Sequence, residues 1–156
     1  VVSALKQAYE NWWTSLSPAF DEYVYVGLGS EREPIARLCC HDWHPVQGDI
    51  NLQPWNQQQI KNDPVSNGFW TVEVLEAGEY EVTLRRRPAG FDEPLPVGTA
   101  RIKIAGLEAE QPVADDQGYV RFNLELPAGR TQLQTWLTSS DGTVRGAYYV
   151  DIRKIP

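Results

Sequence analysis

The fold is decided by one stretch of the sequence, Trp70-Thr71-Val72-Glu73-Val74-Leu75-Glu76-Ala77-Gly78-Glu79-Tyr80-Glu81-Val82-Thr83-Leu84. On either side of the turn signal Ala77-Gly78, apolar and polar residues alternate, which is the pattern of two β-strands that each bury one face. The short connection between the two segments predicts a β-hairpin. The residues predicted to face the core are Trp70, Val72, Val74, Tyr80, Val82 and Leu84.

Alternation with a period of two continues through most of the chain after Pro18. The segments predicted as strands are residues 22–28, 35–43, 69–76, 79–87, 99–106, 118–126, 130–138 and 145–153. Strands in this number, separated by turn signals such as Ala128-Gly129 and Asp141-Gly142, predict an all-β fold, an antiparallel jelly-roll sandwich. Residues 44–67 and 88–98 break the pattern, and long irregular loops of this kind often carry function.

Before Pro18 the apolar residues follow the period of a helix. They recur at steps of three and four, and they are Leu5, Ala8, Tyr9, Trp12, Trp13 and Leu16. Ser3 is the expected N-cap of this helix, and Ser17-Pro18 is its expected end. We expect the aromatic residues to pack the helix on the sandwich or on another domain. The predicted organisation is an N-terminal helix over residues 1–17 and a β-sandwich over residues 18–156, in a single domain.

Composition excludes several classes of protein. The 156 residues are 42% hydrophobic and 11% aromatic, which is enough apolar material to bury a core and excludes disorder. A net charge of −7 argues against nucleic-acid binding, which needs a basic face. No apolar run approaches the roughly 18 residues of a membrane span, so no membrane partner is expected. The chain begins with Val1 and contains no Met, so we expect it to be processed or cut from a longer protein.

Four segments look like those of galactose-binding-like jelly rolls, a fold found among carbohydrate-binding modules. They are residues 68–74, 78–84, 124–129 and 146–152. Their order matches a strand, a Gly-Xaa-Tyr hairpin, an Ala-Gly turn before a late strand and a final aromatic strand. This resemblance implies the same sandwich that the alternation predicts.

Further segments resemble the C-terminal portion of bacterial arylsulfatases of the alkaline-phosphatase-like superfamily. They are Tyr9-Glu10-Asn11-Trp12-Trp13, Gly29-Ser30-Glu31-Arg32-Glu33-Pro34, Asp42-Trp43, Trp55-Asn56-Gln57, Gly68-Phe69-Trp70, Leu84-Arg85-Arg86 and Gly146-Ala147-Tyr148-Tyr149-Val150. The resemblance implies a non-catalytic accessory domain that packs on the catalytic sulfatase domain of the same polypeptide. It also implies a contribution to binding a sulfated polysaccharide, and a periplasmic or extracellular location.

The catalytic motif of sulfatases is absent, so the chain is not expected to be an enzyme by itself. Those enzymes form formylglycine in a Cys/Ser-Xaa-Pro-Xaa-Arg motif, whereas Cys39 is followed by Cys40-His41-Asp42-Trp43. Arg87 is a second departure, because the family has Trp there. No cofactor is expected, and Asp115-Asp116 and Asp141 are turn residues that are candidates for a structural calcium. The alternative function is an independent carbohydrate-binding module that recognises a polysaccharide.

The candidate residues for carbohydrate binding or for docking on another domain are Trp43, Trp55, Asn56, Gln57, Arg85, Gln134 and Trp136. Alternation turns Trp136 outward beside Gln134. A Trp flanked by amides can stack on a pyranose ring or dock on a protein surface. Both interpretations also apply to residues 43–59, although a loop Trp more often fills the core.

Two charged or reactive clusters have structural interpretations that we favour over functional ones. In Arg85-Arg86-Arg87, alternation turns Arg86 inward, where we expect it to form an ion pair with Asp42. The other two arginines are expected to face the solvent. The alternative is that the three arginines bind an anionic sugar. In residues 39–44, alternation puts Cys40 and Asp42 on one side of a strand. Cys39, His41 and Trp43 take the other side. Four metal ligands therefore cannot converge, and structural thiols are expected.

Overall fold

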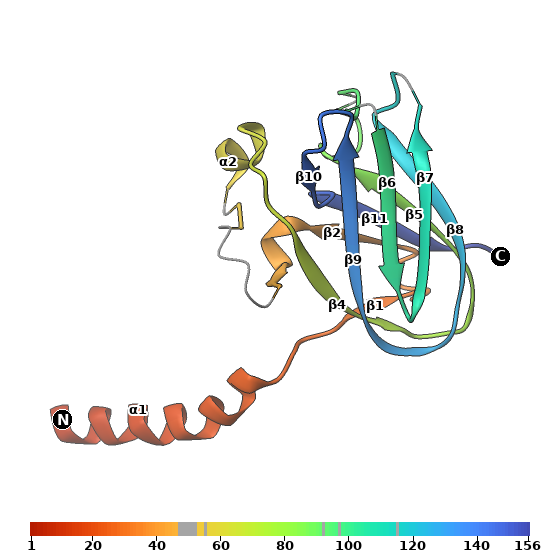
Figure 1. Cartoon of the computed structure of the whole chain (residues 1–156). Helices are drawn as coiled ribbons and strands as arrows, with labels where there is room; N and C mark the ends of the chain where they lie inside the picture. Colours follow the sequence, from red (N-terminus) through yellow and green to blue (C-terminus); the bar gives the residue numbers. More distant parts are fainter. Residues whose placement is uncertain (47–52, 55, 92, 97, 115) are drawn as a thin grey trace.

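Two β-sheets packed face to face form the body of the protein, and helix α1 (Val2–Leu16) projects from it at the N-terminus (Figure 1). This computed structural model describes residues 1–46, 53–54, 56–91, 93–96, 98–114 and 116–156. The predicted fold class, an antiparallel sandwich with an N-terminal helix, is confirmed. Neither α1 nor any other described helix combines the length and apolar character needed to cross a membrane.

The larger sheet has the strand order β1-β4-β9-β6-β7, with β3 beside β4 and β10 beside β9. Its strands are β1 (Val26–Leu28), β3 (His44–Pro45), β4 (Gly68–Val74), β6 (Gly98–Ile104), β7 (Leu107–Val113), β9 (Gly129–Ser139) and β10 (Val144–Arg145). The smaller sheet has the order β2-β11-β5-β8. Its strands are β2 (Ile35–Cys39), β5 (Gly78–Arg85), β8 (Tyr119–Leu126) and β11 (Tyr149–Lys154).

From β4 onward the chain passes from one sheet to the other after each strand or hairpin, as in a jelly roll. Among the described strands, β1 and β4 run parallel and the other pairs run antiparallel. The shorter helical segments lie in connections: η1 (Ser17–Asp21), η2 (Cys40–Asp42) and α2 (Gln57–Lys61).

The core lies between the inner faces of β4 and β5 and their neighbours. All six residues predicted to face it are at most 1% exposed: Trp70, Val72, Val74, Tyr80, Val82 and Leu84. The predicted hairpin is wrong, because β4 pairs with β9 in one sheet and β5 pairs with β11 and β8 in the other. Alternation looks the same for a hairpin and for two strands that face each other across a sandwich, since both turn their apolar residues inward.

Strand β7 was not predicted. Residues 99–106 were expected as one strand, but Ala105 and Gly106 form a tight turn with φ angles of 51° and 78°. The chain then returns as β7, which pairs with β6 at the edge of the described sheet. The apolar alternation of β7 is weak because the strand contains Glu108, Glu110 and Pro112. Such residues are typical of edge strands, since they discourage pairing with a further strand.

Helix α1 is confirmed, although it begins at Val2 and so includes the expected N-cap Ser3. None of its residues, all of which the structure describes, is buried. Tyr9, Trp12 and Trp13 are 57%, 54% and 46% exposed, so the expected packing on the sandwich is not formed. The helix lies away from both sheets (Figure 1).

Trp43 lies in the core and not on the outer surface. Residues Cys40–Asp42 form the 3₁₀ turn η2, which ends the strand at Cys39 and breaks the expected alternation. The Trp43 ring is 3% exposed and contacts the rings of Trp70 and Tyr148, with centroids 5.5 and 6.0 Å away. A Cβ atom at Gly146 would lie 2.6 Å from this ring, so a glycine is required there.

We predict that Trp43→Ala lowers the free energy of unfolding by about 3 to 5 kcal/mol, the usual cost of emptying a buried Trp site. Urea denaturation followed by circular dichroism measures this. Trp136→Ala is the matched control on the outer face of β9 and should cost about 1 kcal/mol or less. Equal losses in the two variants would contradict the buried position of Trp43.

Candidate functional site

The two irregular segments predicted from the sequence meet at one end of the sandwich. Between them lies a cavity of about 300 Å³, within the size range of small-ligand sites. Residues of α2 form one wall, the connection after β5 forms the other, and β11 contributes the floor. The lining residues are Gln57, Ile60, Lys61, Arg87, Pro88, Phe91, Glu93 and Tyr149.

Helix α2 is short and is held at both ends by its own sequence. The side chain of Asn56 caps it by accepting a hydrogen bond of 3.0 Å from the backbone N–H of Gln59. After the last turn, Asp63 takes a left-handed conformation with φ of 53°, which Asp tolerates better than most residues. This conformation ends the helix and lets the Asp63 carboxylate reach the sheets.

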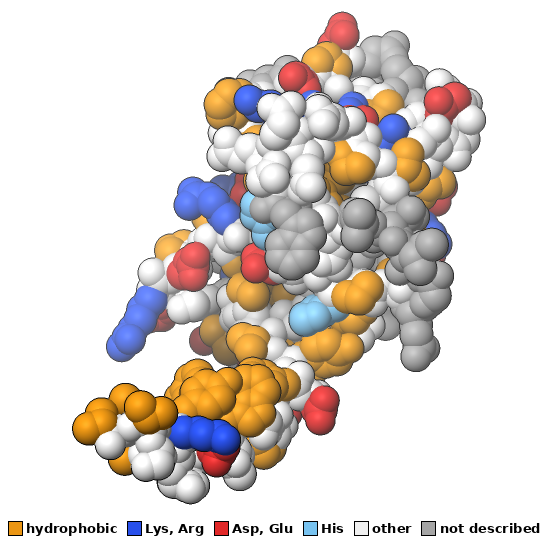
Figure 2. Space-filling view, turned by 90° about the vertical axis from the view of Figure 1, so that its left-hand side faces the viewer, with side chains coloured by type: hydrophobic (Ala, Val, Ile, Leu, Met, Phe, Trp, Pro, Cys, Tyr) orange, Lys and Arg blue, Asp and Glu red, His pale blue; other side chains and the backbone are white. Residues whose placement is uncertain are grey.

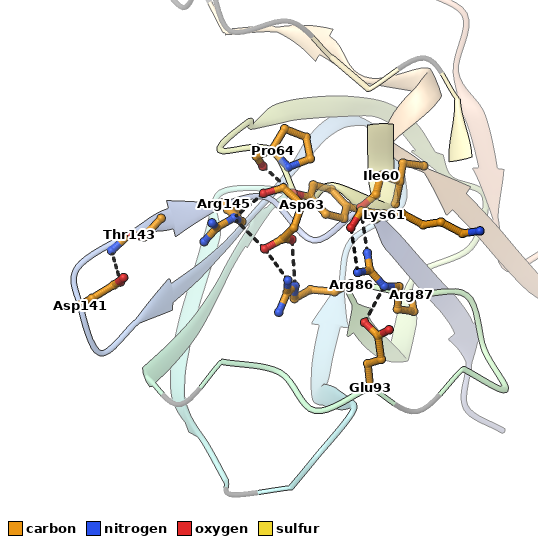
Figure 3. Close-up of polar contacts among 11 residues, drawn as sticks. Ile60, Lys61, Asp63, Pro64, Arg86, Arg87, Glu93, Asp141, Thr143 and Arg145 are labelled. Atoms are coloured by element: carbon orange, nitrogen blue, oxygen red, sulfur yellow. Dashed lines mark hydrogen bonds and ion pairs between the residues drawn. The ribbon is translucent and has the colours of Figure 1, made fainter. Parts of the chain in front are cut away.

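Asp63 is held between two arginines that come from different sheets (Figure 3). Arg86, which follows β5, binds both carboxylate oxygens, one of them at 3.1 Å from Nε. Arg145 of β10 lies 3.3 Å from the same carboxylate and also donates to the Asp63 carbonyl oxygen. The three side chains are only 17 to 23% exposed, so their charges are paired in a partly desolvated site.

Arg87 fixes α2 against the opposite wall of the cavity. Its guanidinium donates to the carbonyl oxygens of Ile60 at 2.8 Å and Lys61 at 3.4 Å, which lie at the C-terminal end of the helix. Its Nε also donates to Glu93 at 2.7 Å. Figure 3 shows these contacts converging from α2 and from the loop that carries Glu93. Arg87 therefore connects the two walls of the cavity.

The cavity combines aromatic surface with polar groups. The ring of Phe91 is 67% exposed, and Tyr149 lies half-buried in the floor, where burial raises the pKa of its hydroxyl to about 12. Tyr149 is therefore a neutral hydrogen-bonding group at neutral pH. Gln57 offers an amide, Lys61 an ammonium group and Glu93 a carboxylate that is 64% exposed. These groups suit a ligand with both apolar faces and hydroxyl groups.

The structure separates the predicted site residues into different places. Asn56 is the N-cap of α2, and Gln57, the first residue of the helix, lines the cavity. Trp55 lies outside the described residues. Trp43 is in the core and presents no ring face to a ligand.

Arg85 is on the outer face of the smaller sheet. It pairs with Asp151 at 3.3 Å and stacks on Tyr119 at 4.8 Å.

The expected roles of the three successive arginines are corrected by these contacts. Arg86 pairs with Asp63 and not with Asp42, which is exposed at the end of the η2 turn. Arg85 and Arg87 are not solvated, because each side chain is 14% exposed and bound to a carboxylate. Strand β5 ends at Arg85, so alternation no longer governs the direction of the next two side chains.

Gln134 and Trp136 lie together on the outer face of the larger sheet, as their alternation predicts. The guanidinium of Arg101 stacks on the Trp136 ring at 3.8 Å and is itself paired with Glu108 at 2.6 Å. One face of the indole is therefore covered. A second cavity, of about 290 Å³, adjoins Gln134 and is lined by Lys103, Ala105, Gly106, Thr131, Gln132 and Gln134.

Metal ligands do not gather in the part of the chain that the structure describes, where no three His, Cys, Asp or Glu side chains form a binding group. Asp141 accepts a hydrogen bond of 2.9 Å from the backbone of Thr143, which lowers the pKa of its carboxyl group. Asp115 lies outside the described residues. The structural calcium stays a prediction.

Cys39 and Cys40 are both free thiols with different surroundings. Cys40 is fully buried, and Cys39 is half-buried on the outer face of the smaller sheet. A hydrogen bond with Cys40 lowers the pKa of Cys39, while the same bond and burial raise the pKa of Cys40. Cys39 is therefore the more reactive of the two.

Several residues of the site were missed by the sequence analysis, among them Lys61, Asp63, Phe91, Glu93 and Tyr149. A signal existed for Phe91, because an aromatic residue in a Pro-rich and Gly-rich loop has no strand to bury it. Asp63 carried no comparable signal, since its partners are 23 and 82 residues away in the chain.

We predict that Asp63→Asn lowers the free energy of unfolding by about 2 kcal/mol, because two partly buried guanidinium groups lose their counter-charge. Asn also accepts a positive φ, so the variant removes charge without adding backbone strain. Glu93→Gln is the matched control and should cost about 1 kcal/mol or less, since Glu93 is largely exposed and Arg87 keeps its carbonyl acceptors. Urea denaturation of both variants is the measurement; similar losses would refute the anchoring role of Asp63.

We further predict that iodoacetamide alkylates Cys39 well before Cys40 in the folded protein. Because the pKa of Cys39 is lowered, the rate should reach half its maximum below about pH 8.5, the ordinary value for a thiol. Peptide mass spectrometry across pH identifies the modified residue. Cys39→Ser should remove the fast reaction, and rapid labelling of Cys40 in that variant would contradict its burial.

The known proteins that this chain resembles are similar to it in structure and not in sequence. No model of a protein family matches the chain, and no curated protein matches it. A ruminal GH26 endo-β-1,4-mannanase matches with a TM-score of 0.44 and 12% identity over 78% of this chain. A GH26-CBM35 β-(1,4)-mannanase of Podospora anserina matches with a TM-score of 0.45 and 10% identity over 80% of it.

A third similar structure is the CBM35 module of Abf62 from Cellvibrio japonicus. It matches with a TM-score of 0.40 and 11% identity, over 74% of this chain and 89% of the module. The chain spans 26% and 28% of the two mannanase chains. These likenesses concern the arrangement of strands and carry no argument about a ligand. None of the three is a sulfatase, and the sulfatase resemblance gains no support from them.

Proposed function

We propose that the chain is a non-catalytic carbohydrate-binding module and that the cavity between α2 and the loop after β5 is its binding site. One observation carries the proposal: an exposed aromatic ring, Phe91, borders a cavity that amide, hydroxyl, ammonium and carboxylate groups also line. Sugars present apolar C–H faces and hydroxyl groups side by side. A stacking ring next to planar polar side chains is suited to both.

A catalytic role is less well supported by the groups present. His44 lies 3.4 Å from the Thr71 hydroxyl, a pair that could suggest a nucleophile and its base. However, that hydroxyl donates to the Val24 carbonyl oxygen at 2.7 Å, so His44 is not its proton acceptor. In the cavity, the Glu93 carboxylate is engaged by Arg87 at 2.7 Å, so it is not free to contact a reacting group.

Docking on a catalytic domain is the second candidate function, and the covered ring of Trp136 favours it. Arg101 occupies one face of that ring, which leaves less of it for stacking on a sugar, while Trp and Arg together are typical of protein interfaces. The more specific hypothesis, an accessory domain of a sulfatase-like enzyme in the periplasm or outside the cell, rests on the sequence resemblance alone.

We predict that the wild-type protein is retarded in native gels that contain a polysaccharide it binds, from a panel of neutral and sulfated polymers. Phe91→Ala should weaken this binding by roughly tenfold or more, because the stacking ring is lost. Phe20→Ala is the matched control, since Phe20 is 64% exposed but lies on η1, away from the cavity. Its binding should be unchanged.

Three variants locate the site if binding is seen. Gln57→Ala should weaken polysaccharide binding, as Phe91→Ala does, whereas Trp136→Ala should leave binding unchanged. Loss of binding in Trp136→Ala alone would show that the binding site lies on the outer face of the larger sheet. If no polymer in the panel retards the protein, the proposed carbohydrate binding is wrong.

A further inference from the structure

Helix α1 carries an apolar stripe that the sandwich does not cover. Its members recur at alternating steps of three and four, which is the spacing of residues at the contact between two helices. They are Val2, Leu5, Tyr9, Trp12 and Leu16, with exposures of 81%, 66%, 57%, 54% and 37%. A water-exposed stripe of this kind is costly, because a helix of 15 residues depends on packing for most of its stability.

Aromatic rings extend the stripe into a continuous surface. Tyr9 and Trp12 have ring centroids 5.9 Å apart, and Trp13 lies 5.3 Å from Phe20 of η1. Figure 2 shows hydrophobic side chains gathered over α1 as one area. Multiplying typical side-chain areas by the observed exposures of the stripe residues, Trp13 and Phe20 gives on the order of 800 Å² of accessible apolar surface. A stable interface buries about the same area on each partner.

The charges of α1 favour a second copy of this helix as the partner. Lys6 and Glu10 pair at 3.8 Å and are the charged side chains of the helix, so α1 is neutral while the whole chain carries −7. Two neutral stripes can approach without repulsion, and identical stripes are complementary to each other under a two-fold axis. A membrane surface is a poorer match, since helices that lie on membranes carry several basic residues on the polar face.

The position of the sandwich selects the direction of pairing. The sandwich is joined to the C-terminal end of α1. Parallel pairing of two α1 helices would therefore bring two sandwiches, each of charge −7, side by side, where they repel each other. Antiparallel helices place the sandwiches at opposite ends of the pair. We propose that the protein forms a homodimer through antiparallel pairing of the apolar stripes of α1.

The test is the mass of the full chain in solution by size-exclusion chromatography with light scattering and by analytical ultracentrifugation. At about 100 µM the wild type should have twice the mass of 17.6 kDa and should dissociate on dilution. Tyr9→Glu and Trp12→Glu should each weaken the dimer at least roughly 30-fold, as expected for central aromatic residues of an interface. Gln7→Glu adds the same charge on the opposite, polar face and should dimerise as the wild type does.

Circular dichroism and urea unfolding of the sandwich separate dimerisation from folding, because α1 contributes no buried residue. Small-angle X-ray scattering of the dimer should reveal two separated bodies, and a single compact body would overturn the antiparallel arrangement. A wild type that stays monomeric at 100 µM overturns the dimer itself. So does a Tyr9→Glu variant that dimerises like the wild type, or a monomer that binds phosphatidylcholine or phosphatidylserine vesicles through α1.

Discussion

The carboxylate of Asp63, held between Arg86 and Arg145, is the interaction on which one end of the sandwich depends. The two arginines come from different sheets, so this one carboxylate ties the sheets and the loop before β4 together. The group is partly desolvated, which strengthens the attraction and makes an unpaired member costly. Asp63 reaches both partners because its positive φ ends α2 and redirects the chain.

The cavity between α2 and the loop after β5 depends on this anchoring. With Asp63 in place, α2 lies where its last carbonyl groups can accept hydrogen bonds from Arg87, and Arg87 in turn holds Glu93. The Tyr148 hydroxyl adds a hydrogen bond to the Pro64 carbonyl oxygen, directly after the anchor. A cavity whose walls are fixed before a ligand arrives loses less conformational entropy on binding. The candidate site is therefore built from loops, yet partly buried ionic contacts hold those loops in place.

The strands themselves were largely predictable, because burial of one face forces alternation on the sequence. Predictions went wrong where a local feature ended the alternation. The η2 turn rotates Trp43 into the core, and the end of β5 at Arg85 frees the next two arginines to turn toward the loops. β7 escaped detection because an edge strand has little apolar alternation.

The sequence by itself determined the sandwich, the amphipathic helix and the positions of the two irregular segments, since periodicity reports which face of an element avoids water. Only the tertiary structure decided which strands share a sheet, because alternation does not identify a strand's neighbour. It also decided that Phe91, Tyr149 and Gln57 border one cavity and that α1 keeps its apolar stripe exposed. Such contacts join residues far apart in the chain, and their free energy arises only when folding brings them together.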